Sequence, residues 1–272
     1  MTYCVATRIH AGIVFLSDSL TNAGVDQISA FRKMAVFEKP GERVVVLMSA
    51  GNLAITQAVK ERLSRRQRIR PDKPVTTLWN AASMFDVAEV VGDALREVHA
   101  RDAAALAEFG VEFNCNVIVG GQIKGEGCRV FHIYSAGNFI EATEENLYFQ
   151  IGESKYGKPI LDRVVKAGTS LEEAVKCLLI SMDSTLRSNV SVGFPLDLLC
   201  YEADSLRMTR FAHINRENDY FQSIRGMWGE RLKQVFAELP NPAWNSDAGR
   251  ESNAKGLWVA DPDSAPDESP PI

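Results

Sequence analysis

Thr2 is the residue of this chain best suited to do chemistry, because it directly follows the initiator methionine. Removal of a methionine is expected when the next residue is as small as threonine, and Thr2 would then carry a hydroxyl and a free α-amine. A hydroxyl nucleophile can use such an amine as its base. The unperturbed α-amine titrates near ~7.7–8.0, which suits a base at neutral pH. Many proteins begin with Met-Thr, so the prediction depends on the residues that accompany Thr2.

Two charged residues stand at positions from which they could reach Thr2. Asp18 closes the second expected strand, and Lys33 stands where the third is expected to begin. A buried ammonium beside the Thr2 hydroxyl would lower the pKa of that hydroxyl and favour the neutral α-amine. Asp18 would keep Lys33 charged and oriented. Taken singly, each of the two residues also fits an ordinary surface position.

Gly51 lies in Ser49-Ala50-Gly51-Asn52, at a change from a strand pattern to a helical pattern. A glycine at such a transition can point its backbone N–H at a developing oxyanion, with the amides of the helix end nearby. By itself it is equally a simple glycine at a helix start. Together, these residues predict one site, with Thr2 as nucleophile and base, Lys33 and Asp18 as its electrostatic support, and Gly51 as oxyanion donor.

The elements that must position these residues come in blocks. A hairpin is predicted around His10-Ala11-Gly12 and a turn at Pro40-Gly41, while Gly120-Gly121-Gln122 is interpreted as a turn between two strands. Apolar periodicity predicts helices at 52–66, 76–109 and 172–186. Strands are predicted at 3–8, 12–17, 34–37, 44–49, 114–120, 129–135, 148–151, in the run that ends at Glu202, and at 207–214. The run 44–48 is continuously apolar, as expected of a strand covered on both faces.

Grouped strands and helices predict an α+β fold, with layered sheets and helices segregated outside them. One domain is expected over 1–240, since no linker occurs before that point. Residues 241–272 are rich in Pro, Ser, Asp, Asn and Gly and are predicted to form a mobile tail, which Trp244 and Trp258 could anchor. The apolar stripe from Leu78 to Val98 is broader than one sheet contact requires, which predicts a subunit interface there.

Composition narrows the class of protein. The 272 residues are 46% hydrophobic and 24% charged, which is typical of a globular domain with a sizeable core. A net charge of −5 gives no electrostatic reason to expect nucleic acid or an anionic membrane as partner. No apolar run approaches the ~20 residues that span a bilayer, and no signal peptide is expected at the N-terminus. We therefore expect a cytoplasmic protein.

The cysteines and histidines predict neither a metal site nor a second nucleophile. The five cysteines form no C-x-x-C pair, which is typical of buried thiols in a reducing compartment. Cys4 has no basic partner nearby in sequence and is interpreted as a core residue. The four histidines form no compact ligand pattern, so no metal and no cofactor are expected.

Taken together, these residues resemble the proteasome-type N-terminal-nucleophile hydrolases, and within them the bacterial ancestral β-subunit family known as Anbu. The resemblance extends from Thr2 to about Pro240 and is most specific at 2–5, 17–19, 21–26, 31–33, 151–159 and 184–193. It implies a four-layer αββα sandwich and a homo-oligomer, either a ring or a helical assembly. It also implies the roles given above for Thr2, Asp18, Lys33 and Gly51, with a peptide or unfolded protein as substrate.

Two segments depart from the pattern of that family. Proteasome β-subunits have an Arg-Asp-x-x-Ser-Gly-Gly stretch near the N-terminal amine, and here the matching stretch runs from Arg187 to Gly193. Ser188 then stands where the carboxylate would be, while Ser191 can still hydrogen-bond the amine. A Gly-Ser-Gly turn of the relatives is Gly152-Glu153-Ser154 here.

These departures leave two alternatives to a threonine peptidase or amidohydrolase. The first is an assembly module with weak or no turnover, and the second is an acyltransferase or amide ligase that uses the same threonine. The sequence specifies no ATPase partner.

Overall fold

The structure is a computed structural model that describes residues 2–22, 28–64 and 76–242. Met1 and most of the predicted tail, including Trp244 and Trp258, lie outside the described residues. The elements are β1 (Tyr3–Ile9), β2 (Gly12–Asp18), β3 (Leu20–Asn22), β4 (Ile28–Ala30), β5 (Met34–Lys39), β6 (Arg43–Gly51), α1 (Leu53–Ser64), α2 (Met84–Glu108), β7 (Cys115–Ile123), β8 (Arg129–Ile133), β9 (Phe139–Glu141), β10 (Tyr148–Gly152), α3 (Lys158–Val164), α4 (Leu171–Ser188), β11 (Leu196–Glu202), β12 (Arg210–Ile214) and α5 (Asp219–Glu238).

The described fold contains two antiparallel five-stranded sheets, one two-stranded sheet and five helices, and it is α+β as predicted. The first sheet has the order β10-β1-β2-β11-β12, and the second has the order β5-β6-β7-β8-β9. β3 and β4 form a separate two-stranded sheet. β1 lies between β10 and β2, so the strand that follows Thr2 is paired on both edges.

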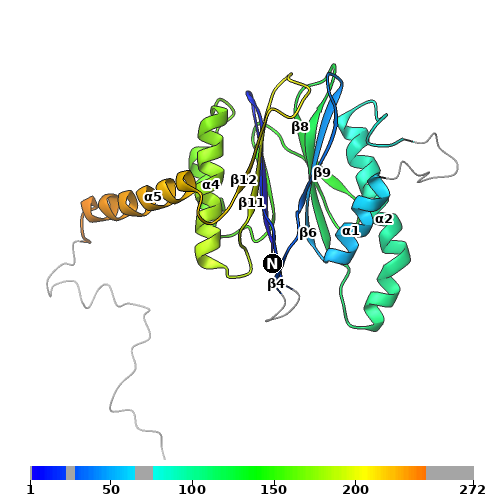
Figure 1. Cartoon of the computed structure of the whole chain (residues 1–272), viewed down its shortest axis with the longest axis horizontal. Helices are drawn as coiled ribbons and strands as arrows, with labels where there is room; N and C mark the ends of the chain where they lie inside the picture. The colour runs from blue at the N-terminus through cyan, green and yellow to red at the C-terminus, as the bar shows by residue number, and fades with distance from the viewer. Residues whose placement is uncertain (1, 23–27, 65–75, 243–272) are drawn as a thin grey trace, which may run out of the picture. The chain divides into compact units, whose positions relative to one another are not determined.

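The apolar side chains form three clusters that follow the layers in Figure 1, where α1 and α2 lie outside one sheet and α4 outside the other. Strand periodicity separates them, because successive side chains point to opposite faces of a sheet. In β6, Val45 and Leu47 pack toward α1 and α2, whereas Val44 and Val46 pack between the two sheets. The prediction that 44–48 is covered on both faces is therefore confirmed.

β1 is divided in the same way. Tyr3 belongs to the cluster under α4, and Cys4 belongs to the cluster between the sheets. Cys4 is fully buried, and burial raises its pKa far above the usual range of a thiol. The interpretation of Cys4 as a core residue is confirmed, and all five cysteines are buried and free.

Three sequence-based predictions are wrong. Gly120-Gly121-Gln122 lies inside β7, not in a turn. Gly121 has φ +152°, and an added Cβ would lie 1.9 Å from the carbonyl oxygen of Val44, so a glycine is required where β6 and β7 approach each other. The helix predicted from 76 begins at Met84, because Ser83 caps it with a reciprocal Ser83–Asp86 capping box.

The apolar stripe from Leu78 to Val98 is not a subunit interface. Most of its apolar side chains are buried in the cluster formed by α1, α2 and the second sheet, although Phe85 remains exposed. The apolar face of the helix is therefore largely covered within the chain. Its apolar stripe is broad because it contacts both a sheet and a neighbouring helix.

The sequence prediction also missed α5, which divides between two units of the chain, Met1–Gly229 and Glu230–Ile272. Phe221, in the first unit, is buried against Phe194. The described apolar side chains of the second unit are exposed, namely Leu232, Val235, Phe236 and Leu239. The predicted domain boundary at 240 stays a prediction.

No helix in the described ranges is long and apolar enough to cross a membrane.

Candidate active site

Thr2 is held by the main chain on either side of β1. The backbone N–H of Glu153 donates to the carbonyl oxygen of Thr2 (2.7 Å), and the backbone N–H of Tyr3 donates to Asp18 Oδ1 (3.0 Å). Gly152, with φ +82°, lies directly against Thr2, where an added Cβ would come within 1.9 Å of the Thr2 carbonyl oxygen. Only glycine combines that backbone conformation with so close an approach.

Asp18 and Lys33 form a buried ion pair beside the start of β1. Lys33 Nζ donates to Asp18 Oδ1 (2.5 Å) and to the carbonyl oxygen of Leu20 (2.7 Å), and both charged side chains are almost completely buried. Asp18 Oδ2 accepts a third hydrogen bond from the backbone N–H of Gly193 (3.3 Å). Burial raises the pKa of Asp18, while the Lys33 ammonium and the backbone donors oppose that shift. The contacts favour an Asp18 that is ionised and holds Lys33 in one orientation.

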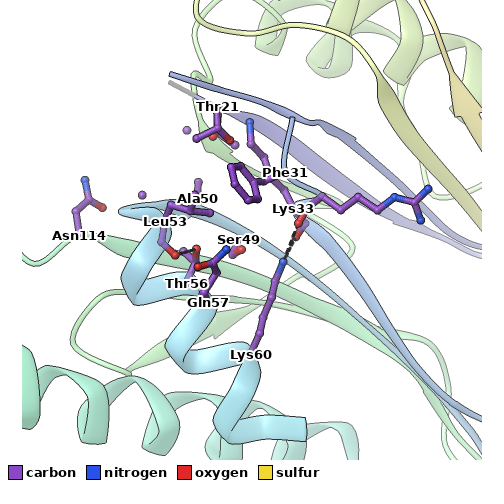
Figure 2. A pocket seen from close by; sticks show the side chains of 14 residues that line it. Thr21, Phe31, Lys33, Ser49, Ala50, Leu53, Thr56, Gln57, Lys60 and Asn114 are labelled. Atoms are coloured by element: carbon purple, nitrogen blue, oxygen red, sulfur yellow. Dashed lines mark hydrogen bonds between the residues drawn. The ribbon is translucent and has the colours of Figure 1, made fainter. Parts of the chain in front are cut away.

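Thr2, Lys33 and Gly51 line one pocket of about 490 Å³, which is shown in Figure 2. The pocket lies where the first sheet meets β6 and the start of α1. Its other described lining residues are Thr21, Phe31, Arg32, Ser49, Ala50, Leu53, Thr56, Gln57, Lys60, Asn114 and Gly152. The structure therefore brings together three of the residues singled out in the sequence, with Asp18 directly behind Lys33.

Gly51 ends β6 in a conformation that few other residues adopt. Its φ is +122°, and an added Cβ would lie 2.2 Å from the carbonyl oxygen of Asn114. The same carbonyl accepts the backbone N–H of Asn52 (2.9 Å), and Asn52 Oδ1 accepts the backbone N–H of Ala54 (3.0 Å). This arrangement begins α1 beside the pocket, which then extends along the helix face that carries Leu53, Thr56, Gln57 and Lys60.

Lys60 is a pocket residue that the sequence prediction missed. Figure 2 shows it reaching from α1 toward the main chain at Lys33, where Nζ donates to the carbonyl oxygens of Arg32 (3.1 Å) and Lys33 (3.2 Å). Burial lowers the pKa of Lys60. In sequence it opens the basic stretch from Lys60 to Arg70, which is typical of a solvated helix end and the loop after it. Its contacts fix the backbone from which Lys33 extends.

Ser188 and Ser191 are not among the lining residues of this pocket. Ser188 is the last residue of α4 and is exposed, whereas Ser191 is half-buried in the loop that follows. The loop itself approaches the site, because Gly193 bonds to Asp18.

Glu153 is the second residue that the sequence prediction missed. Its carboxylate is buried and accepts from Asn189 Nδ2 (3.0 Å), while its own N–H binds the Thr2 carbonyl. The signal was present in the sequence, since Glu153 follows Gly152 in the altered Gly-Ser-Gly turn.

Two antiparallel sheets with helices outside, and a threonine that enters a central strand beside a buried Asp–Lys pair, define the class of proteasome β-subunit-like proteins. No protein-family model matches the chain, and no curated protein matches it either. Several solved structures, however, match the chain over most of its length.

Anbu, the ancestral β-subunit, from Yersinia bercovieri is 53% identical, with a TM-score of 0.82 over 89% of this chain and 99% of that one. Anbu from Hyphomicrobium sp. strain MC1 is 48% identical, with a TM-score of 0.82 over 89% of this chain and 100% of that one. A helical assembly of the Anbu complex from Pseudomonas aeruginosa is 47% identical, with the same TM-score and the same coverage of both chains. The chain belongs to the Anbu family.

Proposed function

We propose that this protein is an N-terminal threonine hydrolase, a peptidase or amidohydrolase in which Met1 is removed and Thr2 attacks an amide carbonyl. The observation that carries the proposal is the shared pocket: Thr2 and the buried, Asp18-bound Lys33 line the same cavity. A positioned ammonium stabilises the developing alkoxide of the nucleophile. The freed α-amine of Thr2 takes the hydroxyl proton and later gives it to the leaving amine.

The oxyanion of the tetrahedral intermediate requires donors fixed in advance. We assign the backbone N–H of Gly51 to this role, because Gly51 lines the pocket and α1 begins two residues later. Donors of this kind are each worth ~10²–10³-fold in rate. Ser191, in the loop bonded to Asp18, is proposed to hydrogen-bond the α-amine, and Ser188 leaves the site without the carboxylate that proteasome β-subunits have there.

We further propose a four-layer αββα sandwich that assembles into a homo-oligomer, and a cytoplasmic location suited to five free thiols. The oligomer is supported by the helical assembly of the Pseudomonas aeruginosa relative and by the exposed apolar side chains of α5, Leu232, Val235, Phe236 and Leu239. Exposed apolar patches of this kind mark interaction surfaces. An enclosed or helical assembly would restrict substrates to peptides and unfolded chains.

Covalent labelling tests the proposal. The intact mass of the native protein should lack Met1, and a β-lactone or peptide boronate should modify Thr2 once per chain. Thr2→Ala should remain folded and unlabelled. A form carrying an uncleaved N-terminal tag should also fail to react, since its α-amine has become an amide.

The two alternatives give different outcomes. A folded, processed protein that no threonine-directed reagent modifies would be an assembly module instead of an enzyme. Transfer of the acyl group to an added amine, in preference to water, would identify an acyltransferase.

A further inference from the structure

The side chain of Glu153 is a buried carboxylate for which the described chain supplies no cation. It is 5% exposed, and among the described residues its oxygens accept only from Asn189 Nδ2 (3.0 Å) and from the backbone N–H of Lys155 (3.4 Å). Both donors are neutral amides. A buried charge is costly unless it is paired, and two neutral donors compensate it only in part. The environment of Glu153 therefore calls for one more positive group.

Three contacts place the Glu153 main chain, and the loop that its carboxylate binds, at the start of β1. The backbone N–H of Glu153 binds the Thr2 carbonyl at 2.7 Å, so the two residues are direct neighbours. The loop that carries Asn189 also carries Gly193, whose N–H binds Asp18, and Asp18 in turn binds the N–H of Tyr3. The Glu153 carboxylate is thus tied to a loop that reaches the main chain directly after Thr2.

Removal of Met1 creates a positive group at this place. The amide nitrogen between Met1 and Thr2 becomes an α-amine, which is protonated below its pKa of ~8. We propose that the carboxylate of Glu153 is the counter-ion of this α-amine, a positioning residue that replaces the charge absent at Ser188. The proposal rests on the proposed function, because it requires the processed N-terminus.

The other charged groups around Thr2 cannot take this role. Asp18, from β2, is neutralised by Lys33, which precedes β5. Lys60, from α1, and Arg32 are cations and would repel an ammonium. Among the described groups at the site, Glu153 is thus the carboxylate not already paired with a cation.

The chemistry follows from the pairing. An opposite charge in contact stabilises the ammonium and raises the pKa of the amine. The neutral amine is then a stronger base for the Thr2 hydroxyl, while a smaller fraction of it is neutral near pH 7, an effect opposite to that of the Lys33 ammonium. The opposite charge also fixes the amine in one orientation. Glu153→Gln keeps the shape and the hydrogen bond to Asn189 but removes the charge, so the apparent pKa of the α-amine should fall by about 1 unit.

The experiment measures the amine directly. Full-length processed protein is treated with trace acetic anhydride between pH 5 and 10, and acetylation of the Thr2 amine is followed by mass spectrometry of the N-terminal peptide. The variants are Glu153→Gln, Glu153→Asp, which retains the charge, and Glu145→Gln as an exposed control. The expected result is a downward shift of about 1 unit in Glu153→Gln, with Glu153→Asp closer to the wild type and Glu145→Gln unchanged.

A second measurement, urea unfolding, tests the proposal without Glu153→Gln, in case that variant folds poorly. Processed wild-type protein should resist urea better than the form with an uncleaved N-terminal tag, because only the processed form pairs Glu153. That difference should shrink in Glu153→Asp, whose shorter side chain reaches the amine less well.

The proposal that Glu153 is the counter-ion is overturned by either of two results. One is an unchanged apparent pKa of the α-amine in Glu153→Gln, and the other is equal urea stability of the tagged and processed wild-type proteins. Neither result affects the labelling of Thr2 by a β-lactone, which tests the proposed function separately. Retention of Met1, seen in the intact mass, overturns both proposals at once.

Discussion

Gly152→Ala should displace Thr2 and slow its reaction far more than it lowers the stability of the fold. The added Cβ would lie 1.9 Å from the carbonyl oxygen of Thr2 and 2.7 Å from its carbonyl carbon, both main-chain atoms. Carbon and oxygen atoms that are not bonded stay at least ~3 Å apart, so Thr2 must move by about 1 Å. A misplacement of that size costs ~10²-fold in rate when it affects a reacting group.

Gly41→Ala is the matched control. Gly41 also has a positive φ, +75°, but nothing lies within 4 Å of an added Cβ. Both variants therefore lose the ~1–2 kcal/mol that an L-residue costs in the left-handed region, and only Gly152→Ala displaces Thr2. Urea unfolding measures the first effect, and the rate of Thr2 labelling by a β-lactone measures the second.

The expected result is a similar loss of unfolding free energy in both variants, or a larger one in Gly152→Ala, with ~10²-fold slower labelling in Gly152→Ala alone. Intact masses must show that Met1 is removed in each protein. If Gly152→Ala is folded, processed and labelled as fast as the wild type, the close contact between Gly152 and Thr2 does not position the nucleophile.

Three further changes test other parts of the structure. Lys33→Ala should slow labelling by at least ~10²-fold and cost ~3–5 kcal/mol by leaving Asp18 buried and unpaired, whereas the exposed Lys39→Ala should do neither. Burial raises the pKa of Cys115 from 9.0 to about 12, so above pH 9 the folded state keeps a proton that the unfolded state releases. The unfolding free energy should therefore fall by ~1.4 kcal/mol per pH unit for this thiol, and less steeply in Cys115→Ala. Leu232→Asp with Phe236→Asp should give a lighter species in sedimentation without loss of folding.

The strands and helices around the site could largely be predicted because their patterns are local. The hairpin of β1 and β2, the turn before β6 and the periodicity of α4 are each contained in a short stretch of sequence. α5 was missed because much of it is exposed, so burial did not impose a strong apolar period. Gly121 was misinterpreted because a glycine pair is typical of a turn, whereas here it lets β6 approach β7.

The candidate site could be predicted only in part, for a related reason. Thr2, Asp18, Lys33 and Gly51 stand at strand ends, where a change of pattern marks them. Lys60 and Glu153 act through contacts between residues distant in sequence, Lys60 with Arg32 and Glu153 with Asn189. Such contacts depend on how the layers pack, which no local pattern specifies.

The order of the first sheet has a consequence for how the protein matures during synthesis. β1 is made early, but its partner β10 ends about 145 residues later, and β11, which pairs with β2, ends at Glu202. At ~5–20 residues per second, most of the chain must be translated before either pairing can form. The segment that contains Thr2 therefore lacks its partner β10 for many seconds on the ribosome, although its hairpin with β2 can form early. If Met1 is removed, as proposed above, an aminopeptidase can act during that interval, before β10 pairs with β1.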